Sequence, residues 1–108
     1  MTTTKEKPNV IELHLEKCLS DVCEITGVQS HEIMSRQRGF NYICDARFLV
    51  YCTLKAHELD PPFTQIGKIM GRDHGAIMNG IKQIKNRASY CKKMKAKVKA
   101  LRERGHRI

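Results

Sequence analysis

The sequence contains few residues that interrupt helices and few that stack on nucleobases. Its 108 residues include three prolines, and apolar residues recur at three-to-four spacing along most of the chain. Because proline breaks helix interiors and this spacing marks one face of a helix, we predict an all-α fold. Three tyrosines and three phenylalanines offer no aromatic platform of the kind that reads single-stranded RNA.

Long apolar runs are also missing. No segment approaches the roughly 20 apolar residues of a membrane span, and the N-terminus lacks the apolar stretch of a secretory signal. The five cysteines form no C-x-x-C pair, a pattern typical of buried thiols in a reducing compartment. We therefore expect a cytoplasmic protein that makes no membrane contact.

Motifs that would indicate catalysis or a cofactor are absent as well. There is no G-x-x-x-x-G-K-[ST] phosphate loop, and the adjacent Asp73 and His74 diverge around a helix instead of forming a relay. His14 and Cys18 lie one helical turn apart and, with Cys23, form a candidate metal-binding set. However, Cys18 falls on an apolar stripe, where a buried free thiol is the commoner case. We predict no enzyme activity, no cofactor and no metal.

Acidic residues are almost absent from the last quarter of the chain. The stretch up to Ile81 has 9 basic and 10 acidic residues, whereas the stretch from Lys82 onward has 11 basic and 1 acidic. Such an asymmetry favours a polyanionic partner. The length suits one domain, which we place at residues 9–104, between a disordered stretch 1–8 and a tail 105–108.

Apolar spacing predicts where the helices lie. Near the N-terminus and in the middle of the chain it predicts helices over Asn9–Thr26, Ser30–Met34 and Asp45–Leu59. The apolar stripe from Ile77 to Leu101 fits one long basic helix from Asp73 to about Arg104. It also fits two helices with a break at Asn86–Ser89. The apolar side of this C-terminal helix needs a partner, for which the candidates are the N-terminal helix, a second copy of the chain or an initiator protein.

The segment 64–86 has the pattern of a helix-turn-helix. Thr64 is a candidate N-cap, Gly71 suits a turn that needs a positive φ, and Asp73 can cap the second helix. The positions i, i+4 and i+7 of that helix predict a buried stripe of Ile77, Ile81 and Ile84. The outward positions are then Gly75, Asn79, Lys82 and Asn86. A helix pair of this kind presents the start of its second helix to the major groove of DNA.

Gly71-Arg72-Asp73-His74, followed by two small residues and Ile77, resembles a known signature. In the C-terminal DNA-binding domain of the bacterial replication initiator DnaA, G-R-D-H precedes two Ser or Thr residues and an aliphatic residue. The likeness covers roughly Val22 to Ile84 and includes Ile33–Arg38 and Phe63–Gly67. It implies a small helical, Trp-repressor-like domain that binds double-stranded DNA in replication initiation or its regulation.

The resemblance also implies DNA contacts at particular residues. Arg38, with Arg36 beside it, matches an arginine that enters the minor groove, and Arg47 and Lys55 match cationic contacts. The tip of the major-groove helix matches Arg72, Asp73 and His74. The predicted DNA-binding set is Arg36, Arg38, Arg47, Lys55, Thr64, Arg72, Asp73, His74, Gly75, Asn79 and Lys82.

Two features of the sequence keep the target and the function open. Gly75 and Ala76 replace the family's two hydroxyl residues, so we do not expect the family's usual recognition sequence. Glycine can offer a base neither a methyl group nor a hydroxyl. The charge pattern alone also fits a small basic RNA-binding protein, or a regulator that acts by contact with an initiator protein.

Overall fold

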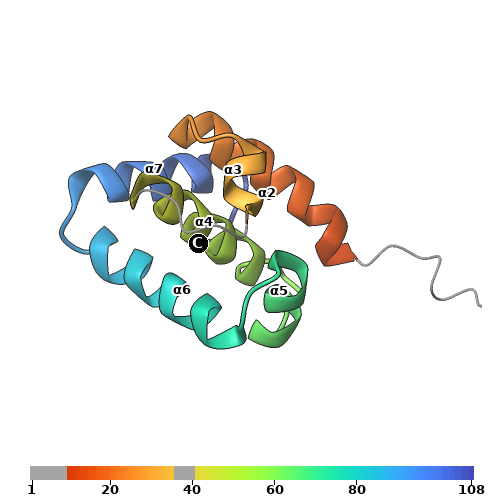
Figure 1. Ribbon diagram of the computed structural model, residues 1–108. Coiled ribbons are helices and arrows are strands. Elements are labelled where there is room, and N and C mark those ends of the chain that lie inside the picture. Colours follow the sequence, from red (N-terminus) through yellow and green to blue (C-terminus); the bar gives the residue numbers. More distant parts are fainter. Residues whose placement is uncertain (1–9, 36–40) are drawn as a thin grey trace, which may run out of the picture.

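The computed structural model describes residues 10–35 and 41–108, which form six α-helices and no strand. The all-α prediction is therefore confirmed. No helix in these two ranges is both long and apolar enough to cross a membrane. Figure 1 shows the helices, which are α2 (Val10–Thr26), α3 (Ser30–Met34), α4 (Asn41–Lys55), α5 (Phe63–Met70), α6 (His74–Ala88) and α7 (Lys92–Glu103).

Helix α4 lies at the centre of the bundle, with α6 on one side and α2 and α7 on the other (Figure 1). Apolar side chains cover most of its circumference, and those of Leu49, Val50, Tyr51 and Leu54 are buried. A helix that is apolar on nearly all sides must be enclosed by its neighbours. The other helices thus form a shell around α4, and α5 and α6 are held on one side of it.

The bounds predicted for α4 were wrong by four residues at each end. The helix begins at Asn41 because Ile43, 7% exposed, extends the buried stripe one turn upstream. It ends at Lys55, and the chain then turns so that the Asp60 N–H donates to the His57 carbonyl at 2.7 Å. Pro61 follows this turn and cannot donate a helical hydrogen bond. The bounds predicted for α3 are confirmed, and α2 ends at Thr26 as expected.

A continuous helix from Asp73 to Arg104 does not form, and the alternative of a break is confirmed. Helix α6 ends at Ala88, and the Cys91 N–H closes the turn on the Arg87 carbonyl at 2.7 Å. Helix α7 then runs back and packs against α2 and α6. This reversal buries three apolar residues that a straight helix would leave in water, namely Met94, Val98 and Leu101.

The partner of this apolar stripe is therefore the chain's own α2. Contact of this helix with a second copy or with an initiator protein stays a prediction from the sequence. The lysines of α7 form its outer surface. They do not prolong α6, and in Figure 1 α7 and α6 lie on different sides of α4.

The segment after α7 packs back onto α2 instead of extending as a tail. His106 is 6% exposed, and its Nε2 lies 2.6 Å from a carboxylate oxygen of Asp21. The same carboxylate is paired with Lys17 at 2.8 Å and Arg104 at 3.2 Å. Burial alone would raise the pKa of Asp21, but the hydrogen bonds from Lys17, His106 and Arg104 outweigh burial and lower that pKa to about 2. Residues 105–108 thus belong to the domain.

Candidate functional site

Helices α5 and α6 form a tight pair joined by the three residues 71–73. Gly71 has a φ of 68°, as the turn required, and the Arg72 N–H donates to the Gly67 carbonyl at 2.8 Å. Asp73 caps α6 as predicted, because its side chain accepts a hydrogen bond from the Gly75 N–H at 3.0 Å. The prediction for Thr64 was wrong, since Pro62 is the N-cap of α5 and Thr64 lies exposed in its first turn.

Two glycines allow the close packing of this pair. A Cβ on Gly67 would lie 2.5 Å from the Arg72 carbonyl oxygen, and a Cβ on Gly80 would lie 2.6 Å from a ring carbon of Phe48 on α4. Neither position has room for a side chain. A glycine inside a helical pattern is the only sequence signal of such a contact, and the predicted site includes neither residue.

The burial pattern of α6 confirms the predicted orientation of the helix. Ile77, Ile81 and Ile84 are 0%, 6% and 2% exposed. The four predicted outward positions are all exposed, namely Gly75, Asn79, Lys82 and Asn86. Other exposed residues lie beside this row and were not in the predicted set, among them Met78, which is 47% exposed, and Lys85. The same helical period could have located them.

The first turn of α6 is uncovered. The side chains of Asp73 and His74 are 78% and 57% exposed, and the Asp73 Oδ1 lies 3.6 Å from the His74 Nδ1. No acidic residue occurs within α6, which also contains Lys82, Lys85 and Arg87. Asp73 already accepts from the first-turn N–H groups of Gly75, Ala76 and Ile77, so the start of the helix offers mainly polar side chains that face water.

Arg72 does not extend freely from this tip. It is half-buried, and its Nη2 donates to the Ser35 carbonyl at 2.6 Å. Ser35 is the last described residue before the segment 36–40. The turn between α5 and α6 is thus tied to the place where the chain leaves α3, and Arg72 has a positioning role that the sequence did not predict.

Arg47 is buried, at 4% exposure, and does not lie at the surface where the predicted phosphate contact would form. Its Nε donates to the Ile33 carbonyl at 2.9 Å and its Nη2 to the Glu32 carbonyl at 3.0 Å. These carbonyls belong to the last turn of α3, where few backbone N–H groups of the helix remain to pair with them. A guanidinium has several donors in a fixed plane and can satisfy two carbonyls at once.

Lys55 is likewise engaged within the chain. Its Nζ donates to the Pro61 carbonyl at 3.0 Å, pairs with Asp60 at 2.9 Å and lies 4.5 Å from the centre of the Phe63 ring. Lys55 therefore holds the connection between α4 and α5 and is a poor candidate for a DNA contact. Arg36 and Arg38, the predicted minor-groove residues, lie outside the described residues.

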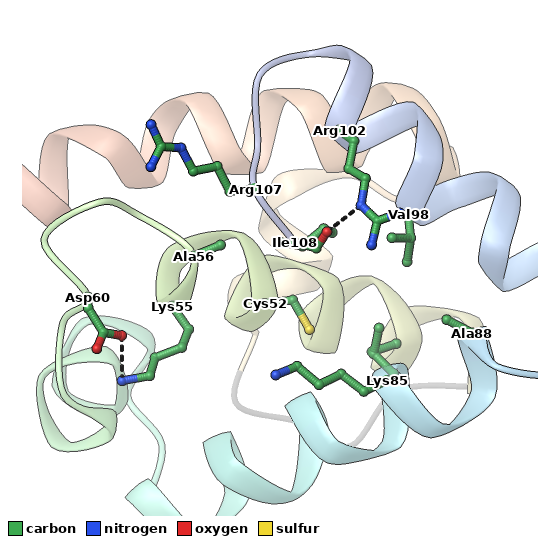
Figure 2. A pocket seen from close by; sticks show the side chains of 11 residues that line it. Cys52, Lys55, Ala56, Asp60, Lys85, Ala88, Val98, Arg102, Arg107 and Ile108 are labelled. Atoms are coloured by element: carbon green, nitrogen blue, oxygen red, sulfur yellow. Dashed lines mark hydrogen bonds and ion pairs between the residues drawn. The ribbon is translucent and has the colours of Figure 1, made fainter.

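A hollow of about 520 Å³ opens between α4, α6 and α7 (Figure 2). Apolar atoms of Cys52 and Val98 line it together with four cationic side chains, which are Lys55, Lys85, Arg102 and Arg107. Figure 2 shows Lys55 turned toward Asp60 and Arg102 toward the Ile108 carbonyl. Because two of the four cations already have partners in the chain, this hollow is a weaker anion site than the start of α6.

The structure thus assembles part of the predicted site. It places Thr64, Asp73, His74, Gly75, Asn79 and Lys82 at the surface of the α5–α6 pair, and it assigns Arg47, Lys55 and Arg72 to internal contacts. Comparison with protein-family models, with curated proteins and with solved structures finds no match to this chain.

Proposed function

We propose that this protein binds double-stranded DNA with sequence preference and acts in replication initiation or its regulation. In this proposal α5 and α6 form a helix-turn-helix like that of the DnaA C-terminal domain, and α6 enters the major groove. The supporting observation is the uncovered start of α6, whose outward row is polar or cationic and free of acidic residues. The role in replication rests on the sequence resemblance.

The exposed residues divide into two kinds of contact. In this proposal the exposed His74 and Asn79 contact base edges, and an asparagine can pair with adenine through two hydrogen bonds. Lys82 is an exposed cation farther along the same face and suits a phosphate. Asp73 keeps its capping role, because one of its oxygens is already bonded to the Gly75 N–H.

The minor-groove part of the proposal concerns the segment that begins after Ser35. Arg72 ties the Ser35 carbonyl to the α5–α6 turn, and Arg47 ties the preceding carbonyls to α4. Arg36 directly follows Ser35 in the sequence. Arg36 and Arg38 are accordingly our proposed contacts in a groove next to the one that α6 occupies.

The test is selection of bound duplexes from a random pool, followed by binding titrations with the selected site. We expect Asn79→Ala to relax the preference at one position and cost about 1–3 kcal/mol there. Lys82→Ala should weaken binding equally for all sequences and reduce the salt slope by about one. Lys99→Ala, an exposed lysine on α7, is the matched control and should leave binding unchanged.

Two outcomes would overturn the proposal. One is selection of no preferred duplex combined with unchanged binding by both α6 variants. The other is equal or tighter binding of single-stranded RNA at the same salt concentration, which would favour the RNA-binding alternative.

A further inference from the structure

Apart from the α5–α6 surface, three residues with metal-binding side chains converge between α2 and the segment after α7. His14 and Cys18 lie one turn apart on α2, and His106 follows α7. One ligand atom of each residue, an imidazole nitrogen or the thiol sulfur, lies within 4.8 Å of the other two. Cys18 and His106 are buried and His14 is half-buried. The fold therefore encloses a donor set that is scattered in the sequence.

The ring of His106 is held in one orientation by Asp21. Its Nε2 lies 2.6 Å from the carboxylate, which Lys17 and Arg104 also neutralise. With the carboxylate on Nε2, Nδ1 is the ring nitrogen that is left to bind an ion. Histidines that bind metals commonly have this arrangement, with a carboxylate on the ring nitrogen that does not face the metal.

The imidazole of His14 has no hydrogen bond within the described ranges 10–35 and 41–108, although it is half-buried. Two other imidazole rings lie beside it, with centroids 4.7 Å away for His57 and 5.8 Å away for His106. Polar groups in such enclosed positions usually have a partner. A metal ion between His14, Cys18 and His106 would provide one.

A hollow of about 260 Å³ lies beside this cluster. His14 and His106 line it together with His57 and Glu58 from the connection between α4 and α5. The hollow gives an ion a route to the cluster and leaves space for a fourth ligand on the open side. The route matters because Cys18 itself is completely buried.

We propose that His14, Cys18 and His106 bind one Zn²⁺ ion, whose fourth coordination position faces this hollow. One sulfur and two imidazole nitrogens are a donor set that suits tetrahedral zinc. Bonds of about 2.0–2.3 Å would place the ligand atoms about 3.5 Å apart, compared with present separations of up to 4.8 Å.

Binding involves no change of oxidation state. The Cys18 S–H bond breaks, the sulfur bonds to zinc, and the proton leaves to solvent, while each imidazole donates a lone pair. The ion joins α2 to the segment after α7 and so acts as a cross-link in the fold. Spacing in the sequence had suggested Cys23 as the third ligand, whereas the folded chain brings in His106 from 88 residues beyond Cys18.

The experiment uses the full chain without a histidine tag, freed of metal by a chelator that is then removed. Titration with Zn²⁺ should show one equivalent bound and a Tm that rises with free zinc. Titration with Co²⁺ should produce a thiolate-to-cobalt charge-transfer band together with visible bands of tetrahedral cobalt. Neither readout involves DNA, so failure here would leave the proposed function untouched.

Variants identify the ligands. His14→Ala and Cys18→Ser should each lower the zinc affinity at least tenfold, and Cys18→Ser should also abolish the charge-transfer band. Cys23→Ala and His31→Ala, which change the same residue types elsewhere, should bind as the parent does. Far-ultraviolet circular dichroism checks that each variant is folded, and His14→Ala is the mildest change because His14 is only half-buried. Absence of a charge-transfer band in the parent, or unchanged affinity in His14→Ala, would overturn the proposal.

Discussion

Replacing Arg47 with alanine separates a structural role from a DNA contact. The guanidinium is 4% exposed and donates to two carbonyls at the end of α3, at 2.9 and 3.0 Å. Hydrogen bonds from a charged group contribute roughly 1.5–3 kcal/mol each. Because the two share one side chain and are not additive, we expect a total loss of about 3 kcal/mol in the free energy of unfolding.

Thermal unfolding makes this loss measurable. An unfolding entropy of about 2.1 cal/mol/K per residue corresponds to about 0.23 kcal/mol/K for 108 residues. A loss of about 3 kcal/mol therefore lowers the Tm by about 13 °C. Lys82→Ala, an exposed change on α6, should leave the Tm unchanged. The reasoning would be refuted if Arg47→Ala kept the parental Tm and instead reduced the salt dependence of DNA binding.

Three further changes test the packing, the thiols and one ion pair. Gly80→Ala should lower stability in urea by about 1–2 kcal/mol, because the new Cβ would lie 2.6 Å from a ring carbon of Phe48 on α4. Gly75→Ala should cost less, because its Cβ would lie 3.0 Å from an Asp73 carboxylate oxygen whose side chain is 78% exposed and can shift. Equal losses in the two variants would contradict the packing explanation. Iodoacetamide at mildly alkaline pH should modify Cys91 before Cys52, as followed by peptide mass spectrometry. Backbone N–H groups in the first turn of α7 lower the pKa of Cys91, while burial raises that of Cys52 to about 12; the reverse order would count against this reasoning. Asp45→Ala removes a partly exposed ion pair between α4 and α6, in which the Asp45 Oδ1 lies 2.5 Å from the Arg87 Nη1. This change should lower the free energy of unfolding by about 1 kcal/mol or less, and by a smaller amount at high salt. A loss that salt leaves unchanged would disprove an electrostatic origin.

The parts of the structure that depend on local chemistry were predictable. Asp73 caps α6 and Gly71 takes a positive φ because each needs only its nearest neighbours along the chain. The buried stripe of α6 follows from one helical period over Ile77, Ile81 and Ile84. These features define the uncovered helix start on which the proposed function rests.

The parts that depend on distant contacts were not predictable. Apolar spacing continues from Ile84 through Ala88, Cys91 and Met94, and no glycine or proline marks the end of α6. The break becomes favourable because α2 and α6 cover α7 in the folded chain. In the same way, nothing near Arg47 in the sequence reveals that its partners are carbonyls 14 and 15 residues earlier.

The hydrogen bond from Arg72 to Ser35 has a geometric consequence. It sets the distance between the N-terminal end of α6 and the point where the chain leaves α3. If residues on both sides of this link touch the same duplex, the protein measures the offset between two patches of bases. Inserting one base pair between those patches would then rotate one patch away from the residues that contact it, although every contacted base is still present.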